Sequence, residues 1–155
     1  MKPNSTAKEQ SLSPRPVTRT QAQSTVAADQ LDERVVLALQ AAAEKKAIDP
    51  TVLDLREIAS FTDFFVITSG ANERQVQAIS DEVYETLKKA GSTAARVEGY
   101  KTAEWILLDY GDFVVHVFEQ KARSFYDLER LWRESKRVEL PAGLFPDTSS
   151  LRRES

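Results

Sequence analysis

Two kinds of periodicity alternate along the middle of this chain, one typical of helices and one typical of strands. Apolar residues at helical spacing predict a first helix that is capped by Asp29 and runs to about Lys46. A second helix is predicted to begin after Asn72, a good N-cap residue, and to end at Gly91. The apolar stripes of the two helices are Leu31, Val35, Leu39 and Ala42 in the first, and Val76, Ile79, Val83 and Leu87 in the second.

Short β-rich runs separate the helices and follow them. Residues 52–55 are predicted to be a strand introduced by Pro50. Residues 64–68 are apolar at odd and even positions alike, which predicts a central strand buried on both faces and ended by Ser69 and Gly70. Residues 96–98 form a third, shorter strand candidate.

Residues 105–118 are the most informative segment, because they form a β-hairpin around a tight turn at Gly111 and Asp112. Side chains alternate along each strand, so the two faces can be assigned. The face expected to lie under the helices is wholly hydrophobic or aromatic: Ile106, Leu108, Tyr110, Phe113, Val115 and Val117. The opposite face is mixed: Trp105, Leu107, Asp109, Val114, His116 and Phe118.

The mixed face of the hairpin points to binding of another macromolecule. If helices cover only one side of the sheet, this face is an exposed apolar patch, and such patches mark interaction sites. Tryptophan is also a residue type that dominates interface energetics. The pattern leaves open that Trp105 is core, covered by a helix bearing Phe125. His116, the only histidine, is expected to be a hydrogen-bonded, half-buried residue rather than an acid or base.

A last helix is predicted to begin near Ser124, where Ser124 and Asp127 form a pair that resembles a capping box. The charged residues 119–123 before it are expected to be a solvated loop. The side chains that the helix is expected to bury are Phe125, Leu128 and either Leu131 or Trp132.

The order of elements, α-β-β-α-β-β-β-α, predicts an α/β fold in which helices pack on a mixed five-stranded sheet. One domain is expected at residues 29–140. Residues 1–28 hold three prolines, eight Ser or Thr and no aromatic residue, with a net charge of +3, and are expected to be a disordered tail. A targeting peptide is the less favoured alternative for that segment. Residues 141–155 are expected to be a flexible C-terminal tail.

Composition removes several classes of function. The absence of cysteine excludes disulfides, thiolate metal sites and cysteine nucleophiles, and it fits a reducing compartment such as the cytoplasm. The net charge of −3, with both signs interspersed, argues against a dedicated nucleic-acid site. No apolar run approaches the roughly 18 residues that a membrane span needs. A single histidine cannot build a multi-histidine metal site, so we expect neither a metal nor a cofactor.

Several blocks follow one another in a fixed order between Asp63 and Trp132. They are residues 63–70 (DFFVITSG), 74–79 (RQVQAI), 97–99 (VEG), the hairpin 105–118 and residues 123–132 (RSFYDLERLW). Together these blocks resemble the ribosome silencing factor family, also called Iojap-like. The similarity reaches back to the first helix near Asp29 and covers neither tail.

This resemblance implies a fold similar to the nucleotidyltransferase domain, without transferase activity. It also implies binding to the large ribosomal subunit through ribosomal protein L-fourteen, at the face where the small subunit docks. The bound factor then blocks subunit joining and lowers translation. Relatives in mitochondria and chloroplasts act in large-subunit assembly, which keeps a biogenesis role and an organellar location open.

The resemblance also carries the family's contact surface over to this chain. Arg123 and Tyr126 match the family pattern but could equally hold the start of the last helix in place. Whether the free protein covers this surface by forming a homodimer stays open. The residues expected to contact the partner are Lys101, Trp105, Leu107, His116, Arg123 and Tyr126.

The rival class is a metal-dependent nucleotidyltransferase. That chemistry needs a Gly-Ser loop to hold phosphates and two carboxylates one residue apart on a strand, so that both reach the same metal pair. Here the order is Ser69-Gly70, and Asp109 and Asp112 lie three residues apart across a turn. We therefore expect a binding protein rather than an enzyme. Direct binding of ribosomal RNA is a third, minor alternative, because the body of the chain is mildly acidic, although the basic N-terminal segment could contact RNA.

Overall fold

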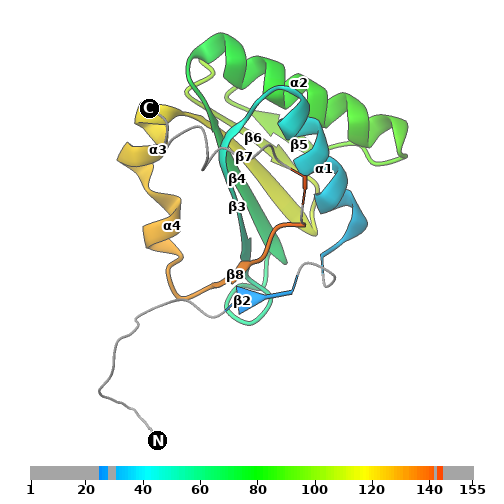
Figure 1. Ribbon diagram of the computed structural model, residues 1–155, viewed down its shortest axis with the longest axis vertical. Coiled ribbons are helices and arrows are strands. Elements are labelled where there is room, and N and C mark those ends of the chain that lie inside the picture. Colours follow the sequence, from blue (N-terminus) through cyan, green and yellow to red (C-terminus); the bar gives the residue numbers. More distant parts are fainter. Residues whose placement is uncertain (1–24, 28–30, 142, 145–155) are drawn as a thin grey trace, which may run out of the picture.

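The computed structural model describes residues 25–27, 31–141 and 143–144, which form one mixed sheet with helices on both faces (Figure 1). The strand order in the sheet is β2-β8-β3-β4-β7-β6-β5. The strands are β2 (Thr25–Val26), β3 (Ile48–Asp54), β4 (Phe64–Gly70), β5 (Arg96–Glu98), β6 (Trp105–Asp109), β7 (Phe113–Glu119) and β8 (Lys136–Val138). The helices are α1 (Glu33–Glu44), α2 (Glu73–Lys89), α3 (Gln120–Tyr126) and α4 (Leu128–Leu131).

Strand β4 lies at the centre of the sheet and is buried along its whole length, as its apolar pattern predicts. It runs antiparallel to β3 and parallel to β7, and helix α2 belongs to the connection between β4 and β7. Strands β6 and β7 form the predicted hairpin, in which Ile106 pairs with Val117 and Leu108 with Val115. The predicted register is therefore confirmed, and with it the assignment of the two faces.

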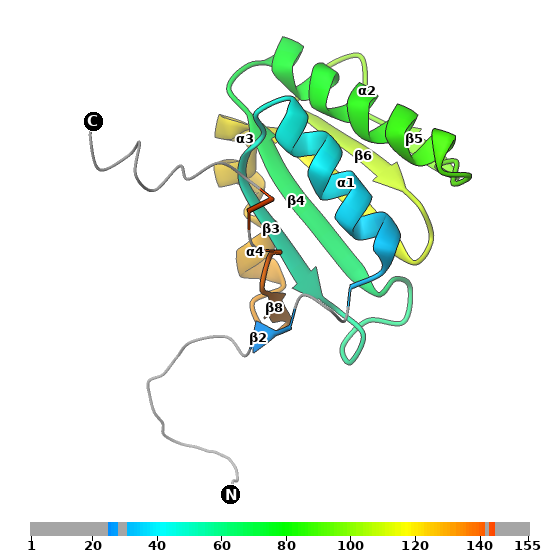
Figure 2. The ribbon, with the colours of Figure 1, turned by 45° about the vertical axis from the view of Figure 1, so that its right-hand side comes forward.

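Helices α1 and α2 cover one face of the sheet (Figure 2). Their predicted stripes point inward, and the predicted face of the hairpin packs in the same cluster. Asn72 caps α2 by accepting a hydrogen bond from the Gln75 amide at 2.9 Å, and Gly91 follows the helix end with a φ of +93°. These features confirm the prediction for the second helix.

The predicted ends of the first helix and first strand are corrected by the structure. Asp29, the expected cap of α1, lies outside the described residues, and Asp32 caps the helix through a 2.8 Å bond from the Arg34 amide. The helix ends at Glu44 rather than near Lys46. Strand β3 begins before Pro50 and ends at Asp54, and an irregular register between Ile48 and Thr51 accommodates the proline.

The sheet has seven strands rather than the expected five, although its mixed α/β class is confirmed. The two additional strands are β8, which pairs antiparallel with β3, and β2, which pairs parallel with β8. Both are very short, with three and two residues. Their sequences, Lys136-Arg137-Val138 and Thr25-Val26, show no alternating apolar pattern, whereas the equally short β5 was predicted at the residues where it lies.

The last helix differs most from its prediction. It begins at Gln120, with Glu119 as the N-cap, so the residues expected to be a solvated loop form its first turn and Ser124 lies inside it. Asp127 adopts a left-handed conformation with a φ of +50° and separates α3 from α4. Of the side chains expected to be buried, Leu128 is buried and Trp132 is partly buried, whereas Phe125 and Leu131 are exposed.

The expected tails lie mostly outside the described residues. Within the described part of the C-terminal segment, Leu144 packs against the core cluster under α1, as does Leu140 just before it. Across the described ranges, no helix is long and apolar enough to cross a membrane.

Candidate docking surface on the open sheet face

The face of the sheet opposite α1 and α2 is only partly covered, by α3 and α4 at one side (Figures 1 and 2). Under these short helices lies a second apolar cluster that includes Phe65, Ile67 and Phe118. Trp105 and Leu107 on β6 border this cluster and are partly exposed. Together with the exposed Tyr126 of α3 they form what we call the Trp105 surface.

Trp105 is held by aromatic neighbours on both elements of this surface. Its ring stacks on Phe118 of the paired strand, with 4.9 Å between centroids, and meets Tyr126 at 4.8 Å. The residue is therefore half core and half surface. The alternative in which a helix bearing Phe125 covers Trp105 is not what the structure shows, because Tyr126 makes the contact and Phe125 points away into solvent.

His116 lies beside Trp105 on the neighbouring strand and is only 3 % exposed. The indole Nε1 of Trp105 donates a hydrogen bond to His116 Nδ1 at 3.0 Å, so the neutral ring carries its proton on Nε2. Nε2 has no hydrogen-bond partner among the described residues, and the ring contacts Phe65 edge-on at 4.5 Å. Burial lowers the pKa of His116 to about 3, which keeps the acceptor nitrogen unprotonated near neutral pH.

His116 therefore orients Trp105 from below, and it does not itself reach the surface. The expectation of a hydrogen-bonded histidine is confirmed for one of its two nitrogens. The expectation of half-burial is wrong, because β4, β7 and the aromatic cluster enclose the ring.

The side chain of Arg123 is also engaged in hydrogen bonds within the protein. Its guanidinium donates to both carboxylate oxygens of Glu129 at 3.2 and 2.8 Å, and to the hydroxyls of Ser69 at 3.0 Å and Thr51 at 3.2 Å. A further bond reaches the Ile48 carbonyl at 3.3 Å. Burial is the largest single influence on the pKa of Glu129 and raises it, but the hydrogen bonds and charge of Arg123, with smaller contributions from Arg137 and Thr51, together hold that pKa below its ordinary value. Arg123 thus ties α3 and α4 to β3 and β4.

Lys101 lies in the exposed turn between β5 and β6, a few residues before Trp105. The geometry of that turn depends on Gly99, which has a φ of +81°. A Cβ atom there would lie 2.1 Å from the Trp105 carbonyl oxygen, so only glycine allows this approach. The turn thereby sets the backbone position of Trp105.

Sequence reasoning missed several exposed apolar side chains that extend the surface around α3 and α4. Phe125, which was expected to be core, is 80 % exposed, and Leu131, one of two alternatives for a buried position, is 71 % exposed, so Trp132 fills that position. Phe61, also exposed, packs against Trp132 with 5.9 Å between ring centroids. A stripe at regular helical spacing did not predict which of these side chains are buried, because the left-handed Asp127 rotates α4 relative to α3.

The groups a nucleotidyltransferase would need are engaged elsewhere. Ser69 is buried and its hydroxyl accepts from Arg123. Asp109 pairs with Arg96 at 3.2 Å on the open face, whereas Asp112 pairs with Arg34 of α1 at 2.7 Å, so the two carboxylates point to different cations. The described residues contain no group of three or more His, Asp or Glu side chains arranged to hold a metal ion.

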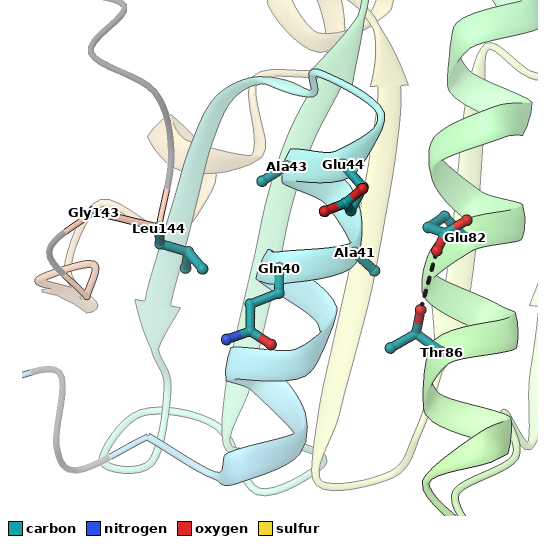
Figure 3. A pocket seen from close by; sticks show the side chains of 8 residues that line it. All are labelled: Gln40, Ala41, Ala43, Glu44, Glu82, Thr86, Gly143 and Leu144. Atoms are coloured by element: carbon teal, nitrogen blue, oxygen red, sulfur yellow. Dashed lines mark hydrogen bonds between the residues drawn. The ribbon is translucent and has the colours of Figure 1, made fainter.

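Another hollow lies on the other side of the molecule, between α1 and α2 (Figure 3). It measures about 610 Å³, and apart from Leu144 the side chains that line it are small or polar. Its walls include Ala41, Glu44, and the Glu82–Thr86 pair at 3.5 Å. This hollow has neither an aromatic anchor nor a cluster of side chains of one chemical type, so it is a weaker candidate for a binding site than the Trp105 surface.

Comparison with known proteins agrees with the motifs. A family described as "Ribosomal silencing factor during starvation" matches residues 28–155. The protein named ribosomal silencing factor RsfS from Halalkalibacterium halodurans is 43 % identical over 108 residues, which cover 70 % of this chain and 92 % of that protein. RsfS from Bacillus subtilis is 37 % identical over 116 residues, which cover 74 % and 98 % respectively.

Solved structures and an organellar relative extend this comparison. A crystal structure of a Bacillus halodurans protein is similar with a TM-score of 0.63 at 42 % identity, covering 70 % of this chain and 98 % of that one. A mouse protein named "Mitochondrial assembly of ribosomal large subunit protein 1" is 29 % identical over 124 residues, which cover 70 % of this chain and 54 % of that protein. The matching family, the length of the matched segment and the shared motifs agree, and this chain belongs to the ribosomal silencing factor family.

Proposed function

We propose that this protein binds the large ribosomal subunit through ribosomal protein L-fourteen and thereby prevents the small subunit from joining. Family membership supports a ribosomal silencing role. The observation that carries the choice of surface is the partly exposed Trp105, held in one orientation by His116 and flanked by Leu107 and Tyr126. A large, pre-oriented aromatic side chain loses little conformational freedom on binding, which suits an interface anchor.

Mixing purified large and small subunits with and without the protein tests this proposal. Light scattering follows subunit joining, and saturating protein is expected to suppress the signal. Lys88→Ala, on an exposed part of α2, is the matched control and is expected to suppress joining as the wild type does. Unchanged joining at saturating wild-type protein contradicts steric silencing.

The choice of ribosomal protein is tested separately. Isolated ribosomal protein L-fourteen is expected to bind the wild type in solution and to bind Trp105→Ala at least about thirty-fold more weakly, the factor that about 2 kcal/mol of a hot spot represents. Equal binding of both variants contradicts the assignment of the Trp105 surface to this partner. Sedimentation analysis of the same two variants without a partner shows whether a homodimer covers the surface.

We further propose that the protein acts without catalysis and in the cytoplasm, with an organelle as the alternative location. The engaged Ser69 and the separated Asp109 and Asp112 support a non-enzymatic role. A second role in large-subunit assembly is favoured by the name of the mouse relative. Gradient profiles of cells that lack the protein test it, because an assembly role predicts precursor particles lighter than mature large subunits.

A further inference from the structure

Within the residues that the structure describes, positive charge is concentrated in one segment. Residues 120–137 contain six Lys or Arg and three Asp or Glu, which gives a net charge of +3. Residues 31–119 contain nine basic and sixteen acidic residues, which gives −7. The basic segment forms α3, α4 and the start of β8, on the side of the sheet away from α1 and α2 (Figure 2). The net charge of the whole chain therefore does not reveal this positively charged region, residues 120–137, which we call the positive corner.

The six cations of this corner differ in their exposure. Arg123 is largely buried against Glu129, Arg137 is partly buried and donates to the Thr51 hydroxyl at 3.3 Å, and Lys136 pairs with Glu57 at 3.0 Å. Lys121, Arg130 and Arg133 are exposed, and the two arginines line a hollow of about 440 Å³ between α3 and α4. We call this feature the α3–α4 hollow; its remaining lining residues are Ser124, Phe125, Tyr126, Asp127 and Leu131.

Exposed rings stand beside these guanidinium groups. Phe125 is largely in solvent and meets Tyr126 edge-on at 5.0 Å, which leaves a face of its ring open. Tyr126 also contacts Trp105, so the hollow is continuous with the Trp105 surface. Guanidinium groups beside an open aromatic face are what single-stranded RNA sites use, since phosphates pair with the cations and a base stacks on the ring.

We propose that the α3–α4 hollow binds a single-stranded segment of ribosomal RNA beside the protein contact made by Trp105. Arg130 and Arg133 pair with backbone phosphates, and a base stacks on Phe125. The proposal rests on the proposed function for the source of the RNA and on the hollow alone for its chemistry. An acidic peptide would satisfy the arginines but would give the open Phe125 ring no planar partner.

The direct test measures fluorescence anisotropy of a labelled oligouridine of about 12 nucleotides with the full-length protein at low salt. Arg130→Ala/Arg133→Ala is expected to weaken binding at least about fivefold and to reduce the slope of log K against log salt by roughly 1.4, because each phosphate contact contributes about 0.7. Phe125→Ala is expected to weaken binding without changing the slope. Lys88→Ala/Lys89→Ala removes the same charge at the end of α2 and is the matched control.

Equal RNA binding by all these variants, or no RNA binding by the wild type, overturns the proposal. A second arm compares large subunits with isolated ribosomal protein L-fourteen. The double arginine variant is expected to bind large subunits more weakly and the isolated protein normally. Equal weakening on both assigns the hollow to the protein partner and also overturns the proposal. If Trp105→Ala binds large subunits normally, the proposed docking surface fails, while the oligonucleotide result still decides the RNA site.

Discussion

Truncating Trp105 separates docking from folding, because this side chain lies half in the apolar cluster and half in solvent. Trp105→Ala removes the ring contacts with Phe118 and Tyr126 and leaves the buried His116 Nδ1 without its donor. A buried polar group left unpaired costs about 1–3 kcal/mol. Since the indole is partly exposed, its removal leaves less of a cavity than the loss of a fully buried tryptophan, which costs about 3–5 kcal/mol. Adding this smaller cavity cost to that of the unpaired nitrogen, we expect a total stability loss of about 2–4 kcal/mol.

The folded Trp105→Ala variant is also expected to bind large subunits more weakly than the wild type. About 2 kcal/mol or more of a hot-spot contact corresponds to at least a roughly thirty-fold weaker affinity. Trp105→Phe refines the test, because it also loses the bond to His116 but keeps an aromatic ring. It is expected to match Trp105→Ala more closely in stability than in binding. Urea unfolding gives the stability of each variant, and sedimentation with large subunits gives the affinity.

Leu108→Ala is the control on the same strand. Leu108 is 1 % exposed on the opposite face of β6, under the helices. Its truncation is expected to cost about 2–5 kcal/mol of stability and to leave the affinity of the folded fraction unchanged. Normal binding by folded Trp105→Ala, or lost binding by folded Leu108→Ala, would refute the assignment of the two faces to docking and core.

Three further predictions concern the groups that support the surface. The pKa of His116 is depressed to about 3 in the folded state, whereas the unfolded value is about 6.5. The stability that this residue contributes is therefore present above pH 6.5 and is lost as the pH falls toward 3. Urea unfolding is expected to show a loss of about 2 kcal/mol between pH 7 and pH 5, and this loss is expected to be absent in His116→Phe. Arg123→Ala leaves the half-buried Glu129 without its partner and is expected to cost about 1–3 kcal/mol, measured by thermal unfolding; an unchanged melting temperature would contradict the tie between α3 and the strands. Calorimetry with magnesium and nucleoside triphosphates is expected to show no binding, and a tight metal-dependent signal would revive the enzyme alternative.

Local patterns determined the elements whose partners are close in sequence. The β6–β7 hairpin has its turn at Gly111 and Asp112, so alternation alone fixed which side chains share a face. The stripe of α2 and its cap at Asn72 follow from spacing within one helix. The apolar run of β4 identified a central strand before any pairing was known. In each case the information lies within a few residues of the feature.

Tertiary structure decided what depends on distant partners. Strands β2 and β8 have no alternating apolar pattern of their own, and they exist because β3 offers a free edge to β8 and β8 offers one to β2. Arg123 became a structural tie because Ser69 and Thr51, from β4 and β3, meet it together with Glu129. The burial of His116 arises in the same way, because Phe65 of β4 packs against its ring.

The extent of the candidate surface is the clearest example of this division. The sequence placed Trp105 and Leu107 on one face, but its helical spacing assigned Phe125 to the core and left Leu131 and Trp132 as alternatives. The structure exposes Phe125 and Leu131, since the left-handed Asp127 breaks the helix and turns α4 onto the sheet through Leu128 instead. Sequence periodicity reports which side chains are apolar, whereas their burial depends on how separately formed elements pack, and only the folded chain determines that.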